Sequence, residues 1–88
     1  MIIKINENLV IRQLDDELII LNADNSCYYG ITNSGIEILK FINERKTCEF
    51  QEIVEFLIAN YEISKDAAIN DINELLNELK SENLIEIN

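Results

Sequence analysis

The stretch Ser26-Cys27-Tyr28-Tyr29-Gly30-Ile31-Thr32-Asn33-Ser34-Gly35 separates two parts of this sequence that differ in hydrophobic periodicity. Before it, short runs rich in β-branched residues are separated by turn-forming residues, a pattern that is typical of strands. After it, apolar residues recur at spacings of three and four, which is the period of an amphipathic helix. We therefore predict a sheet followed by helices, an α+β fold.

The N-terminal part predicts an antiparallel meander of three strands. Residues 9–14 and 17–22 flank the turn Asp15-Asp16, and the aromatic segment Cys27–Ile31 follows a cluster of turn-forming residues. No later strand of useful length is available to pair with the segment from Ser26 to Ile31, so we expect this strand to have a free edge. A free strand edge beside a helix is a place where an extended peptide can bind.

The rest of the chain predicts three helices. Thr32, Asn33 and Ser34 mark the entry to the first helix. Thr47 is the expected N-cap of the second, which ends near Asn60 or Tyr61. Ser64 caps the third helix, whose apolar positions form a wide face: Ala68, Ile69, Ile72, Leu75, Leu76 and Leu79. Residues 84–87 predict a short extended tail.

Length and charge limit the functions that this chain can have. Its 88 residues suit a single domain, spanning residues 1–88, with a thin core. The net charge is −10, and such a surface repels both nucleic-acid phosphates and anionic lipids. We therefore expect neither a nucleic acid nor a membrane as partner. The other explanation of the negative charge is that it simply keeps a small cytosolic protein soluble.

The residue types argue against catalysis and against a metal site. The sequence has no histidine, so a Ser-His or Cys-His pair cannot form, and it has no glycine-rich phosphate-binding motif. Cys27 and Cys48 lack the CxxC spacing of a metal site, and we expect both to be thiols in a reducing cytoplasm. We predict no catalytic residue, no cofactor and no bound metal.

Tyr28 and Tyr29 must point to opposite faces of their strand, because successive strand residues alternate. One ring enters the core and the other faces outward. The outward ring is either a contact for a ligand or a tyrosine that lies over the sheet with its hydroxyl in water. The sequence does not decide which tyrosine faces outward.

Three segments of the chain resemble the family of the pyrroloquinoline quinone biosynthesis protein D, PqqD. They are the junction at residues 28–39, the helical segment 53–64 with its Tyr61-Glu62-Ile63-Ser64 end, and the helix at residues 67–79. No single segment is specific, but their order and spacing are diagnostic together. The chain departs from the family pattern at Thr32, where asparagine is common, and at Asn83, where glycine is common.

The resemblance implies a winged helix-turn-helix-like domain that recognises ribosomally synthesised precursor peptides. In that family the leader segment of the precursor binds as an added strand on the third strand, next to the third helix. A stand-alone domain of this kind is not an enzyme. It presents the leader to a separate modifying enzyme, such as a radical SAM enzyme, or the leader peptidase and cyclase of lasso-peptide biosynthesis.

The resemblance also implies a set of peptide-binding residues. The strand edge comprises Ser26, Cys27, Tyr28, Tyr29, Gly30 and Ile31, and the groove wall comprises Asp71, Ile72, Leu75, Leu76 and Leu79. Asp71 is the expected polar anchor for a lysine, an arginine or a backbone amide of the leader. The alternative is that Asp71 is solvated. Ile69 and Leu76 either line the groove or pack against the second helix or the tail.

Two other functions fit parts of the sequence. A DNA-binding winged helix shares the implied fold, but the third helix carries acidic residues where DNA would bind. An acyl carrier protein matches the length and acidity, but it requires a modified serine in an Asp-Ser-Leu context, whereas Ser34 lies in Asn-Ser-Gly. A free strand edge can also pair with a second copy, so a homodimer stays open.

Overall fold

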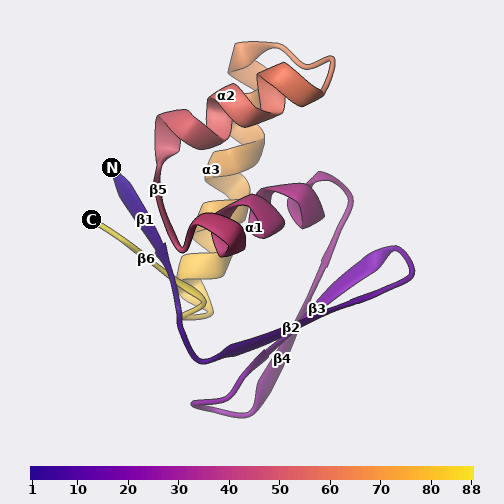
Figure 1. The fold of residues 1–88 in the computed structure, drawn as a ribbon, viewed down its shortest axis with the longest axis vertical. Helices are drawn as coiled ribbons and strands as arrows, with labels where there is room; N and C mark the ends of the chain where they lie inside the picture. Colours follow the sequence, from indigo (N-terminus) through magenta and orange to yellow (C-terminus); the bar gives the residue numbers. More distant parts are fainter.

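The computed structural model describes residues 1–88 and contains six strands and three helices (Figure 1). Along the chain these elements are β1 (Ile2–Ile5), β2 (Leu9–Leu14), β3 (Glu17–Asn22), β4 (Cys27–Thr32), α1 (Ser34–Arg45), β5 (Thr47–Glu49), α2 (Phe50–Asn60), α3 (Lys65–Ser81) and β6 (Ile85–Ile87). The prediction of an α+β fold in which a three-stranded antiparallel sheet precedes three helices is confirmed, and a second sheet is added to it.

The first sheet is the predicted meander, with strand order β2-β3-β4. Asp15 and Ser26 lie in the turns and have positive φ angles of 53° and 59°, a conformation that Asp and other short polar residues tolerate in tight turns. β3 pairs with β4 in a register that places Ile20 opposite Tyr29. β4 has no neighbour on its other side, so the predicted free edge is present.

The second sheet, of order β5-β1-β6, joins the two ends of the chain. Ile3 lies opposite Cys48 of β5 on one side and Ile87 of β6 on the other. The sequence analysis did not predict β1 or β5, because segments of four and three residues carry no measurable periodicity. It predicted β6 only as an extended tail.

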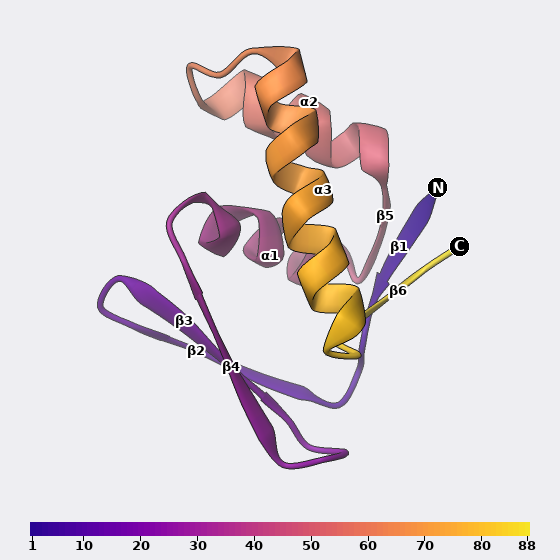
Figure 2. The same ribbon diagram turned by 180° about the vertical axis from the view of Figure 1, so that it is seen from behind.

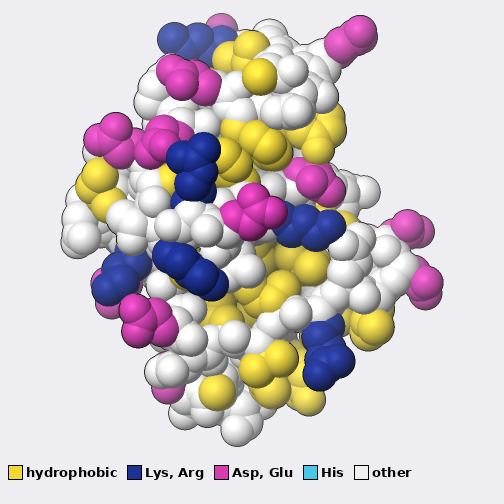
Figure 3. Space-filling model, viewed as in Figure 1, with side chains coloured by type: hydrophobic (Ala, Val, Ile, Leu, Met, Phe, Trp, Pro, Cys, Tyr) yellow, Lys and Arg dark blue, Asp and Glu magenta, His cyan; other side chains and the backbone are white.

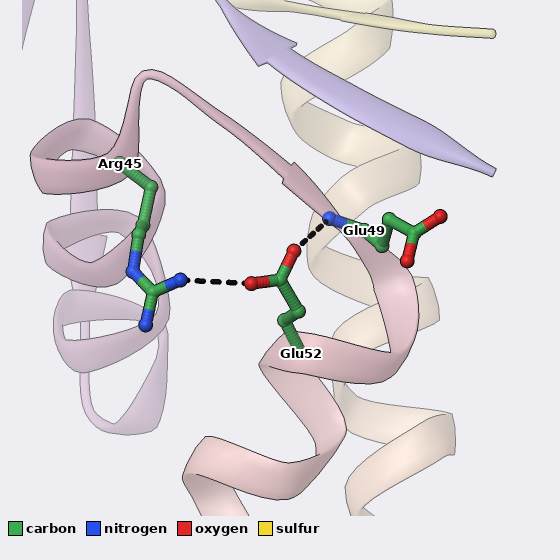
Figure 4. Close-up of polar contacts among 3 residues, drawn as sticks. All are labelled: Arg45, Glu49 and Glu52. Atoms are coloured by element: carbon green, nitrogen blue, oxygen red, sulfur yellow. Dashed lines mark hydrogen bonds and ion pairs between the residues drawn. The ribbon is translucent and has the colours of Figure 1, made fainter.

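The start of α2 differs from the prediction. Thr47 belongs to β5, and the N-cap position of α2 is occupied by Glu49. The backbone N–H of Glu49 donates to Oε1 of Glu52 over 2.9 Å, and Oε2 of Glu52 accepts from Arg45 over 2.8 Å (Figure 4). One carboxylate therefore supports the first turn of α2 and joins it to the last turn of α1.

The predicted start of α3 is confirmed by its cap. Oγ of Ser64 accepts a hydrogen bond from the N–H of Ala67 over 3.2 Å. No helix of the structure combines the length and the hydropathy that crossing a membrane requires.

The helices and both sheets share one hydrophobic core of 21 buried residues. Figure 1 shows α3 behind α1 and α2, and the reverse view in Figure 2 shows α3 in front, with β4 rising beside its lower half. In Figure 3, apolar side chains reach the surface between α1 and the strands below it. The arrangement leaves the free edge of β4 on the side of the molecule that α3 covers.

Candidate functional site

A groove with a volume of about 360 Å³ lies between β4, the start of α1 and the middle of α3. It is lined by residues of all three elements: Tyr29, Gly30, Ile31, Thr32, Asn33, Ser34, Gly35, Ile38, Asp71, Glu74, Leu75 and Glu78. The groove therefore runs along the C-terminal half of β4, continues into its junction with α1, and is closed on one side by α3.

The hydrogen-bond alternation of the meander fixes which backbone groups of β4 are free. Ala23 donates its N–H to the carbonyl oxygen of Asn8 over 2.9 Å, which sets the hydrogen-bonded pairs of the β2–β3 ladder. Successive residues of a central strand bond to opposite neighbours, so Ile20 of β3 bonds to its partner Tyr29 of β4. The backbone groups that face the free edge are therefore those of Tyr28, Gly30 and Thr32.

The pairing also decides which tyrosine faces the groove. Tyr29 lies opposite the buried Ile20 and points to the inner face, toward α3. Tyr28 points to the outer face, where 72% of it is exposed, and it does not line the groove. The ring that lines the groove is thus the inward one, Tyr29. The outward ring, for which the sequence analysis left a ligand contact and a solvated tyrosine as alternatives, is Tyr28.

Tyr29 connects β4 to α3 through its hydroxyl group, which donates a hydrogen bond to Oε2 of Glu78 over 2.6 Å. This hydrogen bond, together with partial burial and the negative charges of Glu78 and Glu82, raises the pKa of Tyr29 to about 12. Both residues line the groove, so the contact joins β4 to α3 at the Tyr29 end of the groove.

The start of α1 forms the other end of the groove. A Cβ atom at Gly35 would lie 2.7 Å from Cγ2 of Ile31, so the close approach of α1 to β4 requires glycine there. Asn33 occupies the N-cap position with a φ of 59°, and its side chain makes no capping hydrogen bond. The predicted capping residues thus lie at the predicted place, but the first N–H groups of α1 have no side-chain partner.

The groove wall on α3 consists of Leu75 and three carboxylates, namely Asp71, Glu74 and Glu78. Their spacing of three, four and seven residues places them on one face of the helix. No group of three or more acidic, cysteine or histidine side chains is arranged to hold a metal ion. The carboxylates are therefore spread along the wall and not gathered at one point.

The structure brings together some of the predicted site residues and separates the others. Tyr29, Gly30, Ile31, Asp71 and Leu75 line the groove. Ser26 and Cys27 are exposed at the far end of the β4 edge. Three wall residues are buried in the core and support α3 from behind: Ile72, Leu76 and Leu79. Ile69 is half-buried and packs against the same core, away from the groove lining.

Sequence reasoning missed Glu74, Glu78, Ile38 and the junction residues 32–35 as parts of the groove. The repeat of acidic residues at positions 71, 74 and 78 was the available signal for the wall, because that spacing selects a single helix face. No comparable signal existed for Ile38, whose position depends on how α1 packs against β4.

Comparison with known proteins identifies the family. Residues 17–85 match the model of the family described as Coenzyme PQQ synthesis protein D (PqqD). No curated protein sequence matches the chain. A solved structure described as "TbiB1 in Complex with the TbiA(beta) Leader Peptide" is 26% identical in sequence, with a TM-score of 0.82 and 94% of each chain covered.

A second solved structure has the same fold at lower identity. It is described as "Lasso peptide synthetase B1 complexed with the leader peptide", and it is 18% identical, with a TM-score of 0.79 over 97% of this chain and 98% of that chain. The family match extends from β3 to β6 and includes β4, α1 and α3, the elements that form the groove. This protein therefore belongs to the PqqD family.

Proposed function

We propose that this protein binds the leader segment of a ribosomally synthesised precursor peptide as an additional strand on β4. The observation that carries the proposal is the position of the free edge: the backbone groups of Tyr28, Gly30 and Thr32 face outward next to a groove of about 360 Å³. Backbone hydrogen bonds to this edge supply affinity, and the groove supplies selectivity for alternate side chains of the peptide.

The other strand edges of the molecule lack this combination. β5 and β6 are the edges of the second sheet, and each has only three residues. β2 is the other edge of the meander, and none of its residues lines the groove. Each backbone hydrogen bond contributes only about 0.5–1.5 kcal/mol in net terms, so a short edge without a groove binds a peptide weakly.

The proposed biological role is that of a carrier and not of an enzyme. The chain would hold the leader while a separate modifying enzyme acts on the rest of the precursor, a radical SAM enzyme or the leader peptidase and cyclase of a lasso-peptide pathway. Both similar solved structures are described as complexes with a leader peptide. We place this role in the cytoplasm, where precursor peptides are made, with no nucleic acid, membrane or cofactor involved.

Proline at Tyr28 is the sharpest test, because the N–H of Tyr28 faces the free edge and proline is tolerated at such edge positions. The ligand would be a synthetic leader from a short precursor reading frame identified beside this gene. Tyr28→Pro removes one donor and blocks close approach of the peptide, so we expect the affinity in calorimetry to fall at least ~10-fold. Tyr28→Ala keeps the donor and should change the affinity less than ~3-fold.

Hydrogen exchange tests the same proposal without a substitution. The leader should slow the exchange of the amides of Tyr28, Gly30 and Thr32 and leave those of β2 unchanged.

Circular dichroism of the Tyr28→Pro and Tyr28→Ala variants shows whether they are folded. A folded Tyr28→Pro variant that binds the leader as well as the unmodified protein would contradict strand addition at β4.

A further inference from the structure

The groove wall on α3 carries negative charge that nothing in the molecule neutralises. Asp71 is half-buried, and neither Asp71 nor Glu74 has a hydrogen-bonding or ionic partner, since the chain forms one ion pair, between Arg45 and Glu52. Glu78 accepts only the hydroxyl of Tyr29. No lysine or arginine lines the groove. Figure 3 shows many of the basic side chains on the face opposite α3.

The lining between these carboxylates and β4 includes apolar side chains. Ile31 and Leu75 line the groove and are 4% and 8% exposed, whereas Ile38 is 1% exposed. A side chain that enters the groove therefore meets carboxylates together with a small area of hydrocarbon. This combination suits a long side chain with an aliphatic stem and a charged end.

The uncapped start of α1 opposes the acidic wall only in part. A helix N-terminus is equivalent to about half a positive charge, whereas the wall on α3 contributes three carboxylates, those of Asp71, Glu74 and Glu78. The net charge of the groups that line the groove is therefore negative. Ser34 and Gly35, whose N–H groups lie in the first turn of α1 and have no side-chain partner, also line the groove.

An added strand directs every second side chain into this groove. The groove extends from Tyr29, which is hydrogen-bonded to Glu78, to the start of α1. Side chains on one face of a strand are about 7 Å apart, so about two residues of the peptide fit along this length. The identity of these inward residues decides which leader binds.

We infer that the groove selects a leader in which an inward-facing residue is arginine or lysine, and this inference rests on the proposed function. The aliphatic stem lies against Ile31 and Leu75, and the charged group reaches Asp71 and Glu74. Arginine suits the site better than lysine, because its planar guanidinium can bond to both carboxylates at once.

Selection of short peptides from a random displayed library tests the inference. Binders are recovered with the unmodified protein, and those whose binding is lost in the Tyr28→Pro variant are sequenced. We expect arginine or lysine to be enriched at one position of these peptides. Replacing that residue by methionine, which keeps the apolar length, should lower the affinity roughly 10-fold.

The net charge of −10 attracts basic peptides to the whole surface, so the variants need a charge-matched control. Asp71→Asn with Glu74→Gln should also lower the affinity roughly 10-fold, with no further loss when the peptide carries methionine. Glu55→Gln with Glu62→Gln removes the same charge from exposed positions outside the groove, and it should change the affinity less than ~2-fold.

The outcomes separate this inference from the proposed function. Peptides that depend on the β4 edge but show no basic preference, or that respond equally to both double variants, overturn the inference and leave strand addition intact. Peptides that bind equally well to the folded Tyr28→Pro variant contradict strand addition itself.

Discussion

The two sheets of this protein have the same number of strands but opposite relations to the rest of the molecule. The β5-β1-β6 sheet is made of segments from the two ends and the middle of the chain, and Ile3, Ile5, Cys48 and Ile85 are buried in it. The β2-β3-β4 sheet is made of consecutive segments, and Val10, Leu14 and Tyr28 are exposed on its outer face.

This difference teaches that a free edge alone does not create a binding site. Both sheets have free edges, but the strands of the β5-β1-β6 sheet are short, and that sheet pairs the two ends of the chain. Only the edge of β4 is long and has a groove beside it. The β2-β3-β4 sheet forms from contacts between neighbouring segments and keeps the edge of β4 unpaired. The β5-β1-β6 sheet requires contacts between distant segments and joins the two ends of the chain.

The largest expected contrast between the sheets is in thiol reactivity. Cys27 of β4 is exposed, whereas Cys48 of β5 is 3% exposed. Burial, and then the Glu52 carboxylate, raise the pKa of Cys48, which lowers its thiolate fraction further. We expect iodoacetamide to label Cys48 at least ~100-fold more slowly than Cys27, because labelling requires local opening.

Intact-mass spectrometry over time would show one fast and one slow addition, and a denaturant should make the two rates similar. Equal rates in the folded protein would mean that the β5-β1-β6 sheet opens as easily as the edge of β4, which would remove the contrast between the sheets.

Substitutions of the two glycines compare the packed junction between β4 and α1, at Gly35, with the middle of β4, at Gly30. A Cβ atom at Gly35 meets Cγ2 of Ile31 at 2.7 Å within the packed junction, so we expect Gly35→Ala to lower the free energy of unfolding by about 1–3 kcal/mol. A Cβ atom at Gly30 meets the mobile carboxylate of Glu17, which can move away. Gly30→Ala should therefore change the stability by less than about 0.5 kcal/mol in urea denaturation.

A smaller loss of stability than that of Gly35→Ala is expected at the contact that joins β4 to α3. Tyr29→Phe removes the hydrogen bond to Glu78, which should lower the free energy of unfolding by about 0.5–1.5 kcal/mol at neutral pH. The pKa of Tyr29 is raised from 10.0 to about 12 in the folded protein, so this stabilisation is complete below pH 10.0 and is lost as the pH rises toward 12.

The measurement is urea denaturation of both proteins between neutral and alkaline pH. The difference in stability between the unmodified protein and the Tyr29→Phe variant should shrink above pH 10.0. A difference that stays constant with pH would show that the Tyr29 hydroxyl does not hold β4 against α3.

Much of the fold follows from local sequence. The meander was predicted within about one residue at each strand, because Asp15-Asp16 and the residues before Cys27 are strong turn signals between β-branched runs. The start of α3 at Ser64 and the end of α2 at Asn60 were predicted equally well. These features depend on residues that are close together in the chain.

The candidate site was predictable only in part. The Asp71 and Leu75 positions followed from the family pattern, whereas Glu74 and Glu78 required knowledge of which helix face meets β4. The choice between Tyr28 and Tyr29 required the pairing register with Ile20. Both decisions depend on contacts between elements.

The sequence by itself determined the meander strands and the three helices, the free edge of the last meander strand and the acidic character of α3, because periodicity, turn residues and charge are local properties. The tertiary structure alone decided that β1 pairs with β5 and β6, that Tyr29 faces α3, and that Gly35 brings α1 against β4 to form the groove. The physical reason is that packing joins residues far apart in the chain, and no short-range pattern records which of them will meet.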